Sequence, residues 1–159
     1  MRVVLSEKDI AERTRAVVVA HSELKGPLLP ILHELQHEFG HVPEGALRVI
    51  ADELNLSRAE VHGVASFYHD FREAPAGRHV LKICRAEACQ SMGADDLAGQ
   101  AESRLDIAFG NTTADGAVTL EAVYCLGLCA CGPAAMVDGK IVARLDAGKL
   151  DTLLSECGQ

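Results

Sequence analysis

The side chains best suited to chemistry are six cysteines, four of which fall into two close pairs. Cys84 and Cys89 enclose four residues, and Cys125 and Cys129 enclose three. Six cysteines are many for a chain that begins without a secretory signal, because reducing compartments disfavour structural disulfides. The two pairs therefore predict a metal or redox site.

Each cysteine pair follows a predicted β-strand. Residues 80–84 (VLKIC) and 118–124 form two apolar runs of strand length, and residues 92–104 between them show helical periodicity. Parallel neighbouring strands that are joined by a helix end at the same edge of a sheet. We therefore expect the two pairs to lie side by side.

Four thiolates suit either a 2Fe–2S cluster or a structural zinc ion. Zinc-binding pairs usually enclose two residues, whereas both loops here are wider. Gly127 leaves backbone N–H groups free to approach cluster sulfur and tune its potential. These features favour iron and sulfur. The alternatives are a zinc-stabilised four-cysteine adaptor without a redox role, or ordinary buried thiols.

A second candidate site is residues 33–37 (HELQH), which fit the H-E-x-x-H pattern of zinc proteases. His33 and His37 lie one helical turn apart, opposite the apolar stripe of their predicted helix, so zinc could bind there in principle. The longer form of the motif needs a third histidine where Pro43 stands. A chance match on a polar helix side is the preferred interpretation.

Residues 1–74 are predicted to form an α-helical bundle. Apolar periodicity indicates helices over residues 6–21 and 28–39 and a further helix around residues 47–54. Gly40 is a natural helix stop, and Ser57 and Glu60 form a capping box that opens another helix. The core face of that helix is predicted to be Val61, Val64, Ala65 and Tyr68.

Residues 75–159 are predicted to form a small mixed α/β sheet domain. The Asp138-Gly139 pair indicates a tight turn between strands at residues 135–137 and 141–143. A last helix is expected over about residues 146–155. Cys157 would then be a bystander on its fraying end.

Composition excludes several function classes. Fifteen basic and twenty-three acidic residues give a formal charge of −8, and no basic cluster offers a footprint for nucleic acid. No apolar run approaches the length of a membrane span. Neither a secretory signal nor a mitochondrial transit peptide is recognisable. We expect a cytoplasmic protein that binds neither nucleic acid nor membrane.

The cysteine pattern resembles the thioredoxin-like 2Fe–2S ferredoxin family. The resemblance covers about residues 25–155, and its motifs are residues 84–89 (CRAEAC), 119–121 (TLE), 124–129 (YCLGLC), 40–43 (GHVP), 55–57 (NLS) and 61–68 (VHGVASFY). The family includes the small iron–sulfur subunit of respiratory NADH dehydrogenase and the corresponding subunits of NAD-reducing hydrogenases. It also includes the gamma subunit of molybdenum-dependent, NAD-linked formate dehydrogenases. Residues 67–71 (FYHDF) and 129–133 (CACGP) are most similar to that gamma subunit.

The resemblance implies a thioredoxin-like fold and an electron carrier without an active site of its own. One 2Fe–2S cluster would be ligated by Cys84, Cys89, Cys125 and Cys129. Cys131 departs from the simplest family pattern, and we treat it as a neighbouring thiol.

The implied partners are a flavin- and NADH-binding iron–sulfur subunit, which carries FMN and NAD, and a molybdenum-containing catalytic subunit. The helical half would serve as a docking element for the flavin subunit. The equivalent subunit of a respiratory NADH:quinone oxidoreductase or an NAD-reducing hydrogenase is the alternative to a formate dehydrogenase.

Overall fold

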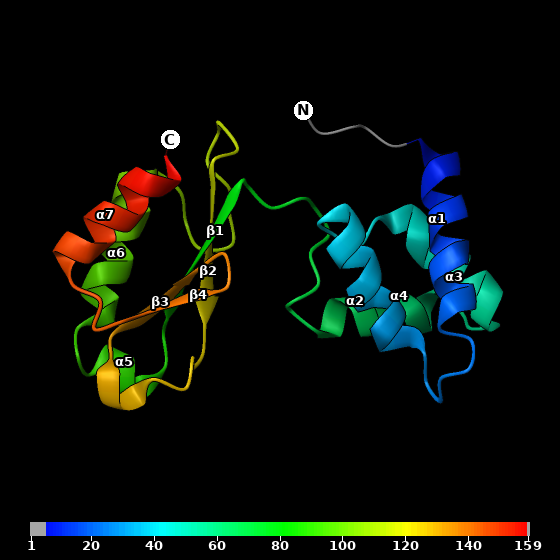
Figure 1. The fold of residues 1–159 in the computed structure, drawn as a ribbon, viewed down its shortest axis with the longest axis horizontal. Coiled ribbons are helices and arrows are strands. Elements are labelled where there is room, and N and C mark those ends of the chain that lie inside the picture. The colour runs from blue at the N-terminus through cyan, green and yellow to red at the C-terminus, as the bar shows by residue number, and fades with distance from the viewer. Residues whose placement is uncertain (1–5, 159) are drawn as a thin grey trace. The chain divides into compact units, whose positions relative to one another are not determined.

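The computed structural model describes residues 6–158. The chain divides into two compact units between Pro75 and Ala76 (Figure 1). Each unit has its own hydrophobic core, and each is described by itself below.

The first unit is built from four helices: α1 (Glu7–Ala20), α2 (Leu28–Phe39), α3 (Glu44–Leu54) and α4 (Arg58–Phe67). Capping boxes begin α1 and α4. The Ser57 hydroxyl accepts from the Glu60 N–H at 3.2 Å, while the Glu60 carboxylate accepts from the Ser57 N–H at 2.8 Å. Gly40 ends α2 with a φ of 77°, a left-handed conformation that glycine adopts without steric cost.

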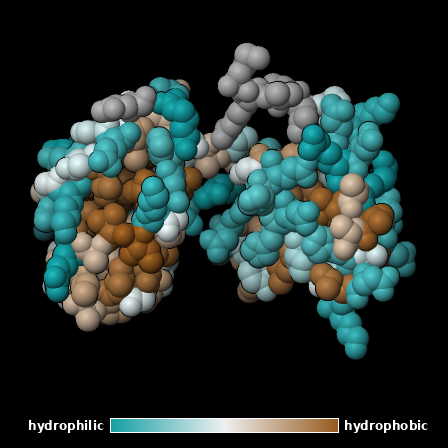
Figure 2. Space-filling view, viewed as in Figure 1, coloured by the Kyte–Doolittle hydropathy of each residue, from teal (hydrophilic) through white to brown (hydrophobic). Residues whose placement is uncertain are grey.

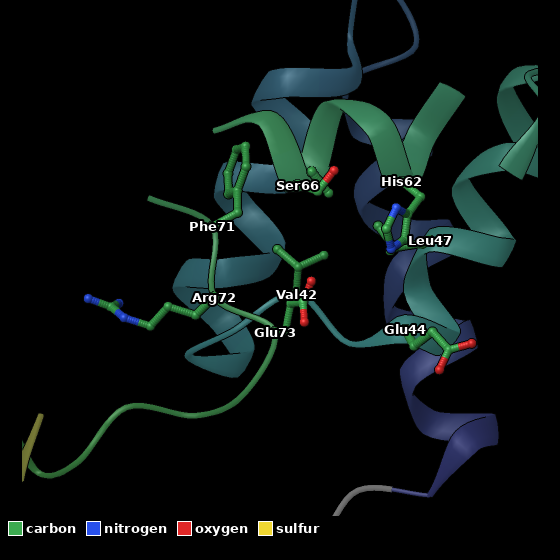
Figure 3. Close-up of a pocket in the computed structure, with 9 residues that line it drawn as sticks. Val42, Glu44, Leu47, His62, Ser66, Phe71, Arg72 and Glu73 are labelled. Atoms are coloured by element: carbon green, nitrogen blue, oxygen red, sulfur yellow. The ribbon is translucent and has the colours of Figure 1, made fainter. Parts of the chain in front are cut away.

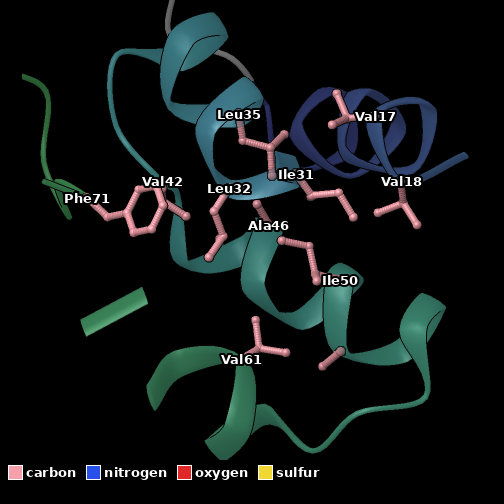
Figure 4. Packing of buried hydrophobic residues seen from close by; sticks show 11 residues of the cluster. Val17, Val18, Ile31, Leu32, Leu35, Val42, Ala46, Ile50, Val61 and Phe71 are labelled. Atoms are coloured by element: carbon pink, nitrogen blue, oxygen red, sulfur yellow. The ribbon is translucent and has the colours of Figure 1, made fainter. Parts of the chain in front are cut away.

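The core of this unit lies between the apolar faces of the helices (Figure 4). Ile31, Leu32 and Leu35 of α2 are fully buried and pack with residues of the other three helices. The predicted core position of Tyr68 is wrong, because this side chain is 44% exposed. Helix α4 ends at Phe67, and Tyr68 has an extended backbone, so it leaves the helical phase on which the prediction relied.

The second unit contains a four-stranded mixed sheet in the order β2-β1-β3-β4. Its strands are β1 (His79–Cys84), β2 (Val118–Val123), β3 (Ala134–Val137) and β4 (Lys140–Ala143). Strands β1 and β2 are parallel, whereas β3 is antiparallel to both β1 and β4. The predicted hairpin turn is present, with positive φ at both Asp138 and Gly139.

Helices α6 (Ala94–Leu105) and α7 (Ala147–Cys157) lie on one side of this sheet (Figure 1). Helix α6 begins two residues later than predicted, since Gly93 before it has a left-handed backbone. Helix α7 extends two residues further than predicted. Cys157 lies seven residues after the buried Leu150 and is itself only 2% exposed. The expectation of a fraying helix end at Cys157 is therefore wrong, because the i, i+7 spacing returns this residue to the core.

A candidate metal centre at one end of the sheet

The two predicted cysteine pairs leave the sheet at the same end. In the parallel ladder, Cys84 at the end of β1 lies opposite Val123 at the end of β2. The ladder continues one residue further, where the Arg85 N–H donates to the Val123 carbonyl at 2.8 Å. Cys125 follows Val123 by two residues, so the expectation that both pairs emerge side by side agrees with this register.

The first pair is buried. Cys84 is 1% and Cys89 2% exposed, and together with Ala94 and Ala134 they form a small cluster of buried residues. Between them the chain makes a tight turn into the short helix α5 (Glu87–Gln90), in which the Cys89 N–H donates to the Ala86 carbonyl at 2.9 Å. This turn returns Cys89 to Cys84, and the two thiols interact directly.

The second pair is exposed and already has the spacing of two ligands on one metal ion. The sulfur atoms of Cys125 and Cys129 are 3.7 Å apart. A tetrahedral metal with bonds of about 2.3 Å to sulfur would separate two thiolates by about 3.8 Å. Cys125 has a φ of 101°, an uncommon backbone for a residue with a Cβ and one that concentrates at functional sites.

The loops of the two pairs are in contact. The backbone N–H groups of Cys125 and Leu126 lie close enough to the Cys84 thiol to lower its pKa. A Cβ on Gly132 would lie 3.3 Å from the Cys89 sulfur. The short 3-10 helix η1 (Cys129–Cys131) precedes this glycine, so the chain after η1 passes close to Cys89 of the buried pair. The tertiary structure thus brings all four predicted ligands to one end of the sheet.

The electrostatics of the thiols fit a site that binds cations. Burial raises the pKa of the Cys84 thiol, but N–H groups of Ala86, Cys125 and Leu126 and the Cys89 thiol outweigh it, so the net pKa is lowered. Burial and the neighbouring Cys84 raise the pKa of Cys89. The Cys125 thiol raises the pKa of Cys129. Adjacent thiolates repel each other, and bound metal ions remove that cost.

Backbone amides of the second loop and of β3 act on the cysteine sulfur atoms. The Gly127 N–H donates to the Cys125 sulfur at 3.3 Å, and the backbone of Ala134 acts on Cys89 in the same way, which lowers the pKa of that thiol against the effect of burial. Gly127 itself has a φ of 77°, a left-handed conformation that glycine adopts without steric cost. Such amides stabilise negative charge on sulfur and so tune the potential of a cluster.

The four thiols are arranged in two pairs, and this arrangement can be compared with what zinc and a 2Fe–2S cluster require. Among residues 6–158, no group of three or more His, Cys, Asp or Glu side chains is placed to share one metal ion. A structural zinc needs four thiolates around a single point, whereas a two-iron cluster needs two thiolates on each iron. Two pairs of thiols at one end of the sheet are what a 2Fe–2S cluster requires, since each iron takes one pair. Cys131 is partly exposed beside the second pair.

The HELQH segment has a structural use. His33 and His37 are both exposed, and the His33 ring packs against Phe71 with 4.9 Å between centroids. Gln36 makes two hydrogen bonds with the chain after α4: its Nε2 donates to the Asp70 carbonyl, and its Oε1 accepts from the Arg72 N–H, each at 2.7 Å. The segment thus holds residues 70–72 against α2.

A hollow of about 340 Å³ opens beside this segment in the helical unit (Figure 3). Its floor is apolar, with Val42 and Phe71, and its polar lining includes Glu44, His62 and Ser66. Neither HELQH histidine lines it. All six cysteines lie in the second unit, so the redox chemistry that they predict belongs there.

Comparison with known proteins decides the family. Residues 14–158 match the family described as thioredoxin-like [2Fe–2S] ferredoxin. The chain belongs to this family. The predicted family, thioredoxin-like fold and 2Fe–2S cofactor are thereby confirmed.

Curated relatives are subunits of larger oxidoreductases. The chain is 33% identical to subunit HndA of an NADP-reducing hydrogenase from Solidesulfovibrio fructosivorans, over 83% of this ferredoxin and 77% of that subunit. It is 36% identical to the E 2 subunit of the NADH-quinone oxidoreductase of Rhizobium meliloti, over 90% and 85% of the two chains. The E subunit of the same oxidoreductase in Escherichia coli is 38% identical, over 76% and 72%.

Among solved structures, the ferredoxin matches an NAD+-reducing [NiFe]-hydrogenase in its H2-reduced state. The TM-score is 0.71 at 27% identity, over 82% of this ferredoxin. The match spans only 22% of the hydrogenase chain. In the described part of this ferredoxin, no helix has the length and apolarity needed to span a membrane.

Proposed function

We propose that this ferredoxin is the 2Fe–2S electron-transfer subunit of a cytoplasmic, multi-subunit, NAD-linked oxidoreductase. Cys84, Cys89, Cys125 and Cys129 would hold the cluster. The observation that carries the proposal is the convergence of these four thiols at one end of the sheet, with one pair already at ligand spacing. When bound, the cluster would accept and release single electrons.

The chain's own residues would protect and tune this cluster. The buried pair, Cys84 and Cys89, shields one side from water, while Cys125 and Cys129 lie at the surface. Residues 124–132 (YCLGLCACG) contain no charged side chain, and apolar residues dominate the surface at the α5 end of this unit (Figure 2). Tyr124 is 76% exposed beside the second pair. An uncharged, exposed loop is suited to close approach by a redox partner.

The parent complex would contain a flavin- and NADH-binding subunit with which this cluster exchanges electrons. The named relatives are subunits of hydrogenases and NADH-quinone oxidoreductases, and they support a complex of that type over a formate dehydrogenase. The formate dehydrogenase hypothesis, with its molybdenum subunit, rests on residues 67–71 and 129–133 alone. Purifying the native complex and identifying its subunits by mass spectrometry separates the two. A molybdenum-containing subunit would favour formate dehydrogenase.

The helical unit is proposed to dock on the flavin-bearing partner. Phe67 is 72% exposed at the end of α4, next to a largely apolar hollow lined by Leu28, Leu56 and Val64. Hydrogen exchange over residues 28–70 is expected to slow when the partner is present. Unchanged protection would count against docking through this unit.

The decisive experiment is metal analysis with electron paramagnetic resonance. The anaerobically purified chain should contain two irons and be brown, and reduction with dithionite should produce the signal of one unpaired electron. Stoichiometric zinc in a colourless chain would instead establish the zinc-stabilised adaptor. A chain with neither metal would refute both.

A further inference from the structure

Arg85, the residue after the first cysteine, connects three segments of the second unit. Its backbone N–H donates to the Val123 carbonyl at 2.8 Å, where the strand that leads to Cys125 ends. Its guanidinium contacts the Asp95 carboxylate of α6 through Nε at 3.1 Å and Nη2 at 3.0 Å. The guanidinium carbon also lies 5.4 Å from the centre of the Phe109 ring.

Asp95 and Phe109, which contact the Arg85 guanidinium, are themselves fixed by other interactions. Asp95 stands in the first turn of α6, where the helix dipole favours a carboxylate. Phe109 follows the same helix, and its N–H donates to the Glu102 carboxylate at 3.2 Å. The next residue, Gly110, donates to the Leu120 carbonyl of β2 at 2.7 Å. Arg85 thus contacts the first turn of α6, the loop after that helix and the end of β2.

We propose that Arg85 is a positioning residue for the metal centre, which holds residues 84–89 in the conformation that presents both buried thiols. The proposal rests on the function proposed above. Its physical basis is that Cys84 and Cys89 flank Arg85 in a turn of six residues. The short helix α5 has too few backbone hydrogen bonds to keep its orientation alone. The contacts with Asp95 and Phe109 attach this turn to α6 and to the loop beyond it.

Arginine is suited to this role in a way that lysine is not. Its planar guanidinium can meet a carboxylate with two nitrogens while one face stacks on an aromatic ring. Lysine would keep the positive charge but lose this geometry. The variant Arg85→Lys therefore separates a positioning role from a purely electrostatic one.

An ordinary ion pair on the same helix provides the matched control. Arg104 of α6 pairs with Asp151 of α7, and both side chains are about half exposed. Exposed pairs of this kind contribute little to stability. Arg104→Ala removes an arginine and an ion pair from α6 without touching either cysteine loop.

The test compares cluster loading and line shape in wild type, Arg85→Ala, Arg85→Lys, Asp95→Asn and Arg104→Ala, all as the full 159-residue chain. We expect both Arg85 variants to release the cluster at least about tenfold faster in the presence of a chelator, the lower range for lost support of metal ligands. Their paramagnetic signal should broaden, because the ligands adopt several geometries. Asp95→Asn should behave similarly, and Arg104→Ala should match wild type.

Circular dichroism shows whether each variant is folded. If Arg85→Ala does not fold, Arg85→Lys and Asp95→Asn decide by the same two measurements. Folded Arg85 variants with wild-type release rates and line shapes would overturn the proposal. Release accelerated equally by Arg104→Ala would also overturn it, because any lost ion pair would then suffice. A wild-type chain that binds no iron would instead refute the proposed function.

Discussion

The six cysteines differ in environment, and the difference predicts their roles. Cys84 and Cys89 are buried, Cys125 and Cys129 are exposed, and all four lie at one end of the sheet. Cys157 is buried in the core beneath α7, where burial raises its pKa. Cys157 belongs to the buried cluster around Leu150 and not to the one that contains Cys84 and Cys89, so we expect it to be a packing residue.

Replacing any one of the four proposed ligands with alanine is expected to abolish the cluster, measured as iron content and visible absorbance. Cys157→Ala should retain the cluster and lose about 1 kcal/mol of stability, since one buried sulfur atom is removed. Cys131→Ala should also retain it. If Cys131→Ala bleaches the protein and Cys129→Ala does not, Cys131 is the fourth ligand.

The hydrogen bond from the Gly127 N–H to the Cys125 sulfur can also be tested with a single substitution. A side chain at its φ of 77° is strained by about 1–2 kcal/mol, so Gly127→Ala should destabilise the loop and weaken the hydrogen bond to Cys125. Losing a donor to sulfur makes the reduced cluster less favourable, so its reduction potential should fall.

The matched control for Gly127 is Gly99, which lies within α6. Outside the backbone of its own helix, no atom lies within 4 Å of the position that a Cβ on Gly99 would take. Gly99→Ala should stabilise the helix by about 0.5–1 kcal/mol and leave the potential unchanged. Equal potentials in the wild type and Gly127→Ala, measured by redox titration, would contradict the role of this amide.

Among the secondary-structure elements, α2 carries a motif that fits a zinc-protease pattern but has a structural role. The stretch HELQH places its two histidines at the surface, and Gln36 between them holds the chain after α4. A single amide side chain carries both a donor and an acceptor, so it can satisfy one carbonyl and one N–H of an irregular segment at once.

Gln36→Ala should lower the free energy of unfolding of the helical unit by about 1–3 kcal/mol, because two hydrogen bonds to the backbone are lost. His37→Ala, one residue away and exposed, should change it by less than about 0.5 kcal/mol. Urea unfolding followed by circular dichroism measures both. Similar losses in the two variants would refute the role given to Gln36. A chelator-sensitive peptidase activity abolished by His37→Ala would revive the zinc protease hypothesis.

For the molecule as a whole, several carboxyl groups support the folded state through their ionised form. Their pKa values are lowered, in four cases chiefly by a hydrogen bond from a neighbouring side chain: Asp9, Glu44, Glu60 and Asp115. At Asp138 burial opposes the lowering of the pKa, but His79 and the Val80 N–H outweigh it. The folded state therefore binds fewer protons than the unfolded chain in mildly acidic solution.

Stability is expected to be highest above the ordinary carboxyl pKa of about 4 and to fall as the pH drops through the lower folded values. Glu60→Gln keeps the capping box but cannot ionise. Its urea midpoint should lie below that of the wild type at about pH 7, and the gap should narrow toward about pH 3. A gap that stays constant with pH would contradict this assignment.

Much of the local structure could be predicted from the residues. The capping box at Ser57, the stop at Gly40 and the turn at Asp138-Gly139 each have a short-range physical cause, and all three are present. The exposure of Tyr68 could not be predicted from local sequence, because the end of α4 depends on contacts with distant residues. The burial of Cys157 could have been predicted, since its spacing from Leu150 carries the signal.

By itself the sequence determined the two cysteine pairs, the strands that precede them and the family to which the chain belongs, because spacing and periodicity are local properties. Only the tertiary structure decided that Cys84 and Cys89 are buried while Cys125 and Cys129 are exposed. It also decided that Arg85 meets Asp95 and Phe109. These contacts join residues that are close only after the sheet and α6 have packed, so no pattern along the chain could reveal them.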